Sequence, residues 1–510
     1  MTASAGRRIG IDVGGTNTDA ALIDGTEVVA SAKATTTDDV LGGITAALAG
    51  VPRDDVAAVV IGTTHFTNAV VQRRDLNQVG FLRIGLPAGQ TLRPLIGWPD
   101  DLANVIHGAT AMVQGGTEFD GRPFMGLDET AVEAAARRFG DLGIDSVVVT
   151  ASFSPVDPGP EERAAEIVRS VLPDATITVS SRLGRLGLLE RENAAGLNAC
   201  LIHLARHTIA AFAAALGHAG FGAETGLYLT QNDGTLLSVD EARAYPVLTF
   251  ASGPTNSMRG AALLAGVTDG IVVDVGGTTA DFGALVAGYP RPANAAVDVG
   301  GVSTLFRLPD LESIGLGGGS IIRTDPLSIG PDSVGQHLVD RARAFGGDTF
   351  TLTDAALAAG RLDIESARPP VDGPHNRTVL DLAASLIADG ADRMKLTAEA
   401  TPLIAVGGGA FAVPDTVPGF DPVVRPPHAG VANAVGAALA EVSGEVDQVF
   451  RDLGREGAIA EATRIAVERA EAAGARPDSI EPIEIEDLPL AYLPGDALRV
   501  RVRVIGRLGS

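Results

Sequence analysis

Short apolar runs alternate with stretches of helical spacing along most of the chain, and this order predicts an α/β protein. The predicted strands lie at residues 9–11, 20–23, 56–62, 146–150, 176–179, 271–273, 282–286 and 402–406, and the predicted helices at 40–48, 69–74, 129–139, 161–171, 188–217, 257–265, 379–396 and 429–440. Residues 227–250 are expected to be strand-like, and 441–473 to be a charged amphipathic helical region. Residues 497–504 alternate with period two, which predicts a half-exposed strand whose Arg499, Arg501 and Arg503 form a solvated edge or a partner surface.

The pentapeptide Asp-Val-Gly-Gly-Thr occurs twice, beginning at Asp12 and at Asp274. Apolar runs precede and follow each copy, and after the first copy Asp24-Gly25 separates two more apolar runs, which is a strong hairpin signal. Each copy therefore predicts a strand, a glycine turn and a second strand. A Rossmann or Walker A loop would open a helix instead, and no GxxxxGK[ST] sequence is present, so a lysine-dependent phosphate loop is disfavoured.

These two turns carry the groups that bind phosphate. Adjacent glycines let the backbone approach a ligand closely, and threonine hydroxyls and free amides donate to phosphate oxygens. Asp12 and Asp274, at the strand ends, are predicted to face each other across a cleft and to hold Mg²⁺ mostly through water. Asp19 and Asp281, three residues beyond each pentapeptide, are predicted to bond turn amides. The predicted phosphate-binding residues are Gly14, Gly15, Thr16, Asn17, Gly276, Gly277, Thr278 and Thr279.

Composition limits the number of domains, the class of protein and the binding partners that can be expected. A chain of 510 residues is expected to form two or more domains, and 45% apolar with 20% charged residues is typical of a globular protein. The formal net charge of −24 disfavours binding to nucleic acid or to an anionic membrane. The single cysteine, Cys200, allows no intramolecular disulfide, and its apolar neighbours indicate a buried helix rather than a catalytic thiol. No signal peptide or membrane-spanning run is recognised, so a cytoplasmic location is expected.

A polar segment between a predicted strand and a helix is the first substrate candidate. Thr63, Thr64, His65 and Asn68 follow the strand at 56–62, where α/β proteins often bind ligands. His65 could polarise a substrate or bind a metal, or it could simply bond the backbone.

Other candidates come from glycine-rich segments and one histidine pair. Ser252, in a Ser-Gly-Pro segment, either positions substrate or ends a strand, and Gly317 and Gly318 could line the substrate cleft. The triplet Gly407, Gly408 and Gly409 is the better candidate for contact with adenine or ribose. His203 and His207 share one helix face, but no third ligand is evident, so a structural role is preferred to a metal site.

The motifs occur in a specific order along the chain: IGIDVGGTNTDAAL near the start, IGTTHFTNAVVQRR at 61–74, GGTEFDGRP at 115–123, LLEREN at 188–193, ASGPTNSMRGAALLAG at 251–266, VVDVGGTTADFGAL at 272–285 and ESIGLGGGSI at 312–321. From about residue 7 to about residue 440, the chain resembles the A-type subunit of the hydantoinase/oxoprolinase family, in the actin/hexokinase/Hsp70-like ATPase superfamily. One departure is Asn17, which stands where that family usually has phenylalanine.

The resemblance implies an α/β fold of two actin-like (ribonuclease H-like) lobes with mixed sheets around a central nucleotide cleft. The N-terminal lobe would take residues 1–255 with an α/β insertion at about 80–190, the second lobe and connecting helix 256–440, and a C-terminal extension 441–510. It also implies ATP, with Mg²⁺ or Mn²⁺, used to open a small cyclic amide of hydantoin or 5-oxoproline type. The implied mechanism phosphorylates the amide oxygen, and the implied assembly is oligomeric with a possible B-type hydantoinase subunit.

The resemblance assigns the site residues as follows. Asp12, His65 and Asp274 would be catalytic, and Thr63, Thr64, Asn68, Ser252, Gly317 and Gly318 would surround the substrate. The alternatives are an ATP-dependent carboxylase of a ketone, a small-molecule kinase of sugar-kinase type, and a nucleotide-switched binding protein without enzymatic activity.

Overall fold

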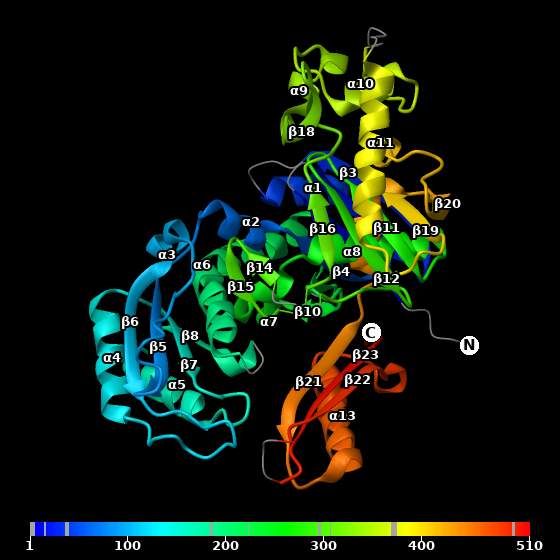
Figure 1. Ribbon diagram of the computed structural model, residues 1–510. Helices are drawn as coiled ribbons and strands as arrows, with labels where there is room; N and C mark the ends of the chain where they lie inside the picture. Colours follow the sequence, from blue (N-terminus) through cyan, green and yellow to red (C-terminus); the bar gives the residue numbers. More distant parts are fainter. Residues whose placement is uncertain are drawn as a thin grey trace.

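The α/β prediction is confirmed. The computed structural model describes residues 6–14, 17–35, 40–183, 187–222, 224–293, 297–306, 308–368, 375–491 and 495–509. These residues form sheets of nine, six and four strands and two two-stranded hairpins. Figure 1 shows two mixed bodies that meet near the centre, with a smaller sheet on one side and a strand–helix unit below.

The nine-stranded sheet begins with the hairpin that the first motif predicts. β1 pairs antiparallel with β2 and parallel with β4, and the sheet continues through β9 and β10. Helices α1 and α6 share its apolar core, which includes Ile9, Ile11, Ile44 and Leu197. The bounds are β1 Arg7–Val13, β2 Asn17–Asp24, β3 Glu27–Thr35, α1 Val40–Ala49, β4 Val56–Thr63, α6 Leu188–His218, β9 Gly226–Thr230 and β10 Leu236–Ser238.

The six-stranded sheet repeats this arrangement around the second motif. β11 pairs antiparallel with β12 and parallel with β19, and β16 continues the hairpin beyond β12. Helix α11 supplies Val379, Ala383 and Ile387 to the core of this half. The bounds are β11 Gly270–Val275, β12 Ala280–Val286, β13 Tyr289–Pro290, β16 Leu311–Ile314, β17 Ser320–Thr324, β18 Leu327–Ser333, α9 Leu338–Arg341, α10 Leu352–Ala358, α11 Asn376–Arg393, β19 Thr401–Val406 and β20 Phe420–Val424.

Two helices of small residues, α8 (Ser252–Ala265) and α12 (Ala432–Ala438), cross between the two sheets. A Cβ atom at Gly260 would lie 1.9 Å from Ala432 O, and one at Gly436 would lie 1.8 Å from Asn256 O. Only glycine therefore permits this close crossing. The crossing places the N-terminus of α8 and one face of α12 beside the first hairpin.

The four-stranded sheet is parallel and lies apart from the nine-stranded sheet (Figure 1). The LLEREN motif, at the start of α6, connects that helix to this sheet. Glu192 accepts from Arg83 on β5 (Nε–Oε1 2.8 Å), and Arg191 donates to Ala151 O on β7 at 2.6 Å. Its elements are β5 Val79–Leu86, α3 Asp100–Ile106, β6 His107–Gln114, α4 Glu129–Asp141, β7 Ser146–Ala151, α5 Gly159–Val171 and β8 Thr176–Val179.

Two sequence expectations near the C-terminus are wrong. Residues 441–473 are not one helical region: β21 (Val442–Phe450) precedes α13 (Gly454–Ala472), because Val442, Gly444 and Val446 alternate inward at period two. The strand at 497–504 is not an edge, since β23 (Leu498–Gly506) lies between β21 and β22 (Glu481–Pro489). Its arginines are accordingly paired with acidic neighbours: Arg499 with Asp447, Arg501 with Glu445, and Arg503 with Asp233.

Two smaller differences concern helices. Residues 227–250 are only partly strand, because α7 (Val239–Ala244) follows β10 through a Ser238/Glu241 capping box. Helix α6 is, by length and composition, apolar enough to cross a membrane, but 56% of the relevant window is buried within the fold, and it serves as a core helix. Cys200 lies buried on this helix, as expected.

Candidate functional site

One backbone hydrogen bond occurs at the same place in both glycine turns. Gly14 N donates to Asn17 O at 3.1 Å, and Gly276 N donates to Thr279 O at 2.9 Å. Both turns join antiparallel strands, as predicted, and Thr278 at the second tip is exposed. Gly15 and Thr16, two of the predicted phosphate ligands, lie outside the described residues.

Four carboxylates gather beneath these turns. The strand register places Asp12 opposite Asp19 and Asp274 opposite Asp281. Burial, together with the Asp19 and Asp274 carboxylates, raises the pKa of Asp12 to about 7. Because Asp274 perturbs Asp12, the structure brings the two predicted metal-binding aspartates together. Burial also raises the pKa of Asp274 and raises that of Asp281 to about 6.

The outer carboxylate of each hairpin has a partner on the next strand. Lys33 on β3 forms an ion pair with Asp19, and Ser313 on β16 donates to Asp281. Each outer carboxylate therefore has a partner across the sheet, and the expectation that Asp19 and Asp281 also bond turn amides stays a prediction. Like charges directly opposite one another destabilise a hairpin. One lysine against four carboxylates leaves the cluster short of positive charge.

Asp12 has one satisfied and one unsatisfied oxygen. Asn433 on α12 donates to Asp12 Oδ2 at 2.7 Å, whereas Oδ1 is buried without a hydrogen-bond partner among the described residues. Oδ1 faces the N-terminus of α8, since Cβ atoms at Gly62 and Gly253 would lie 3.1 Å and 3.7 Å from it. Asn256, one turn further along α8, donates to Thr230 Oγ1 at 2.9 Å. A carboxylate oxygen that remains open in this way is suited to a cation or to its bound water.

Sequence reasoning missed Asn433, Asn256 and Lys33. A signal was available for Asn433, which is the sole polar side chain in the small-residue segment 429–440. Lys33 offered no comparable signal, because its role depends on the register of β3 against β2.

The segment at 63–68 is not a loop. Helix α2 (His65–Gln72) begins at His65, so His65 and Asn68 belong to its first turns. Thr63 Oγ1 accepts from His65 N at 3.1 Å, and Asn68 Nδ2 donates to Thr64 Oγ1 at 3.4 Å. The physical reason is that the Thr63 hydroxyl satisfies the amide of His65, so the helix starts earlier than the apolar pattern indicated, with Thr64 at the N-cap position but without a side-chain capping bond.

This segment lies beside Asp12. Ser252 donates to Thr63 O at 3.3 Å, and a Cβ atom at Gly253 would lie 3.4 Å from Thr64 Cγ2. Ser252 and Gly253 belong to the first turn of α8 rather than to a strand end. The structure thus places Thr63, Thr64 and Ser252 next to Asp12. Burial lowers the pKa of His65, so its imidazole is neutral at pH 7.

The glycine triplets support the second hairpin. Gly318 N and Gly319 N donate to Gly276 O (2.9 Å) and Gly277 O (2.7 Å). A Cβ atom at Gly317 would lie 2.5 Å from Thr278 N, so side chains are excluded there. The predicted substrate residues Gly317 and Gly318 therefore lie against the phosphate turn.

The second triplet, Gly407 to Gly409, bonds the second hairpin and also leaves part of its own backbone exposed. Gly409 N donates to Val275 O at 2.7 Å, and Gly407 has a positive φ of 86° beside Asp274. Gly408 is exposed with no atom within 4 Å of a Cβ position, which leaves its backbone accessible to a ligand.

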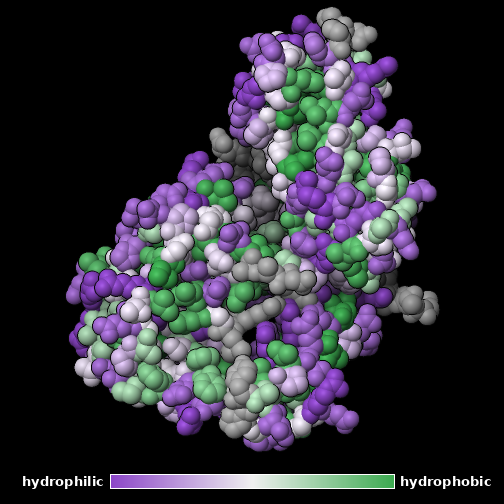
Figure 2. Space-filling model, in the orientation of Figure 1, coloured by the Kyte–Doolittle hydropathy of each residue, from purple (hydrophilic) through white to green (hydrophobic). Residues whose placement is uncertain are grey.

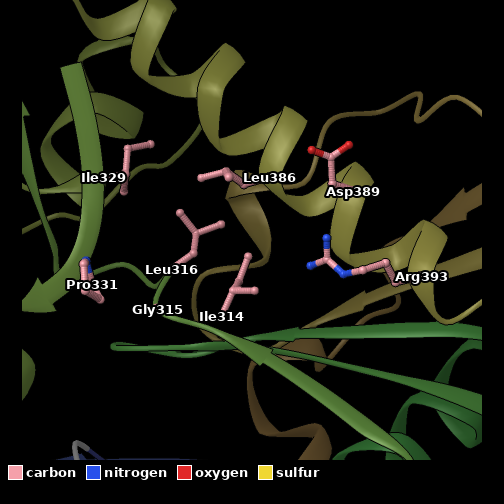
Figure 3. A pocket seen from close by; sticks show the side chains of 8 residues that line it. All are labelled: Ile314, Gly315, Leu316, Ile329, Pro331, Leu386, Asp389 and Arg393. Atoms are coloured by element: carbon pink, nitrogen blue, oxygen red, sulfur yellow. The ribbon is translucent and has the colours of Figure 1, made fainter. Parts of the chain in front are cut away.

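A cavity of about 240 Å³ lies on another part of the second half (Figure 3). Its apolar lining is formed by Ile314, Leu316, Ile329, Pro331 and Leu386. Asp389 and Arg393 complete it, and Arg393 also pairs with Glu312 at 2.6 Å. Figure 2 shows hydrophobic residues gathered in the same upper region of the molecule. None of the four carboxylates lines this cavity.

No group of three or more metal-ligating side chains is found in the part of the chain that the structure describes. His203 bonds Asp145 (Nε2–Oδ2 3.0 Å) and His207 Nδ1 lies 2.9 Å from His203 O, so each imidazole has a hydrogen-bond partner within the protein. A cation at Asp12 and Asp274 would therefore need further ligands from phosphate and water.

Comparison with known proteins gives a consistent family assignment. Models of the hydantoinase/oxoprolinase N-terminal region and of hydantoinase/oxoprolinase match residues 8–172 and 191–401. The caprolactamase subunit alpha of Pseudomonas jessenii is 28% identical over 386 residues, and the acetophenone carboxylase gamma subunit of Aromatoleum aromaticum is 27% identical over 401. Each alignment covers 70% of this chain but only 54% and 53% of those proteins, so the chain spans about half the length of the curated relatives it matches.

Solved structures confirm the fold class. ATP-dependent caprolactamase from Pseudomonas jessenii superposes with a TM-score of 0.72 at 21% identity, covering 98% of this chain and 88% of that one. Nucleotide-free acetone carboxylase gives a TM-score of 0.68 at 19% identity, covering 99% and 88%. The predicted fold of two actin-like lobes with mixed sheets is therefore confirmed.

Proposed function

Because the chain belongs to the hydantoinase/oxoprolinase family, we propose that it uses ATP to open a small cyclic amide by phosphorylating the amide oxygen. The observation that supports the proposal is a glycine turn at the end of each of two hairpins, with Asp274 near enough to Asp12 to raise its pKa. Each turn offers backbone amides to phosphate, and the aspartates offer oxygen ligands to a divalent cation. Caprolactamase, named above as ATP-dependent, supports both ATP use and a cyclic amide substrate.

The residues present fit Mg²⁺, or Mn²⁺ in its place. Asp12 Oδ1 is buried without a partner, and Asp274 lies close enough to perturb it. Mg²⁺ is bound in such sites by one or two carboxylates together with phosphates and water. When bound, the ion would neutralise phosphate charge as it develops during transfer.

The chain's own groups would then hold the reactants. The turns at Gly14–Asn17 and Gly276–Thr279 would bind the phosphates through their backbone amides, and the exposed Gly408 would contact the adenosine. Thr63 and Thr64, with the α8 N-terminus at Ser252, would orient the amide beside Asp12. Transfer of the γ-phosphoryl group of ATP to the amide oxygen would make the amide carbon more electrophilic, so that water adds to it. The C–N bond of this adduct would then break as the ring nitrogen takes a proton, and a second water would hydrolyse the resulting acyl phosphate to carboxylate and phosphate. His65, neutral at pH 7, can accept a proton from the first water.

A second subunit supports the activity in this proposal. The matched relatives are named as subunits, alpha for caprolactamase and gamma for acetophenone carboxylase. We therefore propose a B-type hydantoinase partner within an oligomer in the cytoplasm.

The test is ATP-dependent phosphate release with a panel of lactams, hydantoins and 5-oxoproline, with and without a B-type subunit. We expect stimulated release together with ring-opened product. The matched control is Asp274→Asn, which keeps the shape of the site and removes one cation ligand. No stimulated release from any compound would refute the proposal.

The carboxylase is the second candidate, because acetophenone and acetone carboxylases are among the relatives. Phosphate release that requires a ketone and bicarbonate, with carboxylated product, would select it. A phosphorylated sugar product would select the kinase, and tight ATP binding without turnover would select a nucleotide-switched binding protein.

A further inference from the structure

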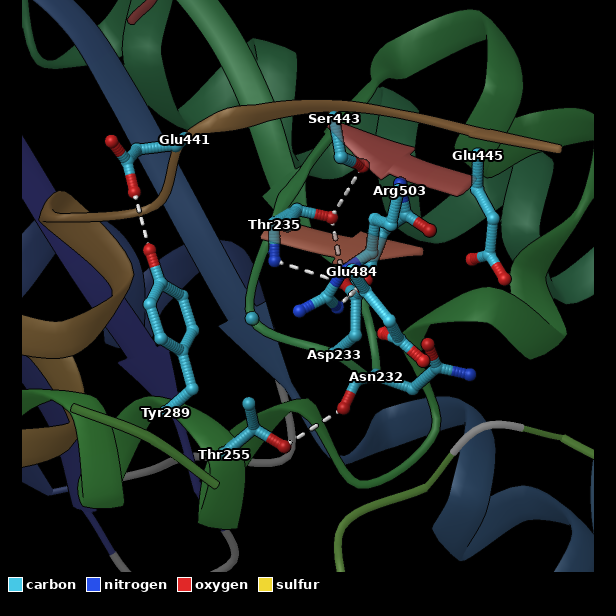
Figure 4. A network of polar contacts seen from close by, with 12 residues as sticks. Asn232, Asp233, Thr235, Thr255, Tyr289, Glu441, Ser443, Glu445, Glu484 and Arg503 are labelled. Atoms are coloured by element: carbon cyan, nitrogen blue, oxygen red, sulfur yellow. Dashed lines mark hydrogen bonds and ion pairs between the residues drawn. The ribbon is translucent and has the colours of Figure 1, made fainter. Parts of the chain in front are cut away.

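Glu441 lies at a junction of four parts of the molecule. It follows α12, begins the run into β21, and faces both α8 and the second sheet. Figure 4 shows Glu441 bonded to Tyr289, close to a second group of polar contacts that includes Asp233 and Arg503 on β23. None of its partners belongs to the carboxylate site.

One carboxylate oxygen of Glu441 is shared by two donors. Tyr289 Oη donates to Glu441 Oε2 at 3.1 Å, and Arg259 Nη2 donates to the same oxygen at 3.2 Å. The Arg259 guanidinium also lies 4.8 Å from the centre of the Tyr289 ring. The side chains of Arg259 and Glu441 are 10% and 27% exposed, so the contact is partly shielded from water. We name these three residues the clasp.

The clasp connects elements that belong to the two halves of the molecule. Tyr289 belongs to β13 of the second sheet, and Arg259 lies on α8 between the two sheets. Glu441 leads from α12 into the nine-stranded sheet, where its backbone oxygen accepts from Leu236 N at 2.8 Å. The clasp therefore fixes the second sheet to the first through the two crossing helices.

The same network continues into the C-terminal strands. Arg259 Nη1 donates to Gly234 O at 2.8 Å, in the turn between β9 and β10. In that turn Asp233 pairs with Arg503 of β23 at 2.8 Å, and Thr235 Oγ1 accepts from Ser443 of β21 at 2.9 Å. Thr255 of α8 donates to Asn232 O at 2.8 Å (Figure 4).

We propose that Glu441 is a positioning residue that sets the angle between the two halves and thereby the geometry around Asp12. The helices it joins carry the groups that surround Asp12: α8 presents Gly253, and α12 presents Asn433. A change in the angle between the sheets moves one turn relative to the other, so the clasp determines how readily the halves close on a ligand. Only the expected effect on ATP turnover, given below, rests on the proposed function.

The experiment measures the distance between the two halves, and it needs no nucleotide. Cys200 is buried and is the only cysteine, so cysteines introduced by Gln72→Cys on α2 and Asp381→Cys on α11 can be spin-labelled selectively. Tyr289→Phe removes one donor to Glu441 and keeps the ring beneath Arg259, and Glu441→Gln removes the charge. We expect both variants to broaden the distribution of label distances measured by pulsed electron resonance, and the double variant to broaden it no further than the larger single effect.

Ser443→Ala is the matched control. It also removes one hydroxyl donor and lies two residues beyond Glu441, but its bond joins β21 to the turn before β10, both within the first half. We expect its distance distribution to match that of the unmodified protein. Equal broadening in all three variants, or none in Tyr289→Phe and Glu441→Gln, would overturn the proposal.

A second measurement tests the effect of the clasp on ATP use, so that failure of the clasp proposal can be distinguished from failure of the proposed function. With ATP and Mg²⁺, the clasp variants should raise the KM for ATP several-fold while their melting temperatures stay near that of the control. If no variant, nor the unmodified protein, binds ATP, the proposed function fails and the distance measurement still decides the role of Glu441.

Discussion

Replacing Asn433 by alanine tests the divalent-cation binding that we propose for Asp12. Asn433 supplies the only hydrogen bond to Asp12 that the structure records, a 2.7 Å contact to Oδ2. Asp12 is 5% exposed and already has a pKa raised to about 7. Removal of the amide leaves a buried carboxylate with neither oxygen satisfied, so the protonated form becomes more favourable.

The size of the effect follows from the hydrogen bond. A hydrogen bond to a charged group contributes about 1.5–3 kcal/mol, and one pKa unit corresponds to about 1.4 kcal/mol. The pKa of Asp12 should therefore rise by about 1–2 units. At pH 7 the ionised fraction would fall from about one half to about 1–10%, which weakens the apparent affinity for a divalent cation about 5- to 50-fold.

The assay is Mn²⁺ binding followed by the electron resonance signal of the free ion, with a non-hydrolysable ATP analogue, from pH 6 to pH 9. The affinity of the unmodified protein should level off above about pH 7, and that of Asn433→Ala about 1–2 pH units higher. Asn198→Ala is the control, since Asn198 on α6 is also buried but donates to Thr178 Oγ1 and Ala244 O, far from Asp12 in the sequence. A loss of affinity that is the same at every pH, or no loss at pH 7, would refute the reasoning.

Three further outcomes follow from the same geometry. Because the pKa of Asp12 is raised from 3.8 to about 7, its contribution to stability is complete below pH 3.8 and is lost as the pH rises to about 7. At pH 8, with a chelator present, urea unfolding should therefore give Asp12→Asn a free energy of unfolding up to about 4 kcal/mol higher than that of the unmodified protein. The difference should disappear near pH 4. Gly317→Ala would place a Cβ 2.5 Å from Gly277 C and Thr278 N, so calorimetry should show ATP affinity reduced about tenfold or more, while Gly126→Ala, at an open position, should leave it unchanged. Burial raises the pKa of Cys200, so a thiol reagent at pH 8 should react with it only after unfolding, and rapid reaction of the folded protein would contradict its buried position.

The hairpins were predictable from the sequence because each is made by neighbouring segments. Asp12 and Asp19 lie on adjacent strands joined by a short turn, so spacing alone sets their register. The partners of those aspartates come from distant segments, as Asn433 does from α12, and only tertiary packing brings them together. The same limit explains the error at β23: its arginines looked like an exposed edge because β22, the strand that covers it, carries no strong strand pattern of its own.

The inner carboxylates explain why the fold tolerates an unfavourable cluster. Directly opposed carboxylates destabilise both hairpins, and Lys33 relieves only Asp19. The rest of the structure holds Asp12 in place regardless, through Asn433 on one side and the α8 N-terminus on the other. Since Oδ1 is already oriented and desolvated before any ligand arrives, a cation that reaches it meets a site that needs no rearrangement. If the site binds the cation proposed above, the stability that the aspartates remove from the empty protein returns as affinity for that cation.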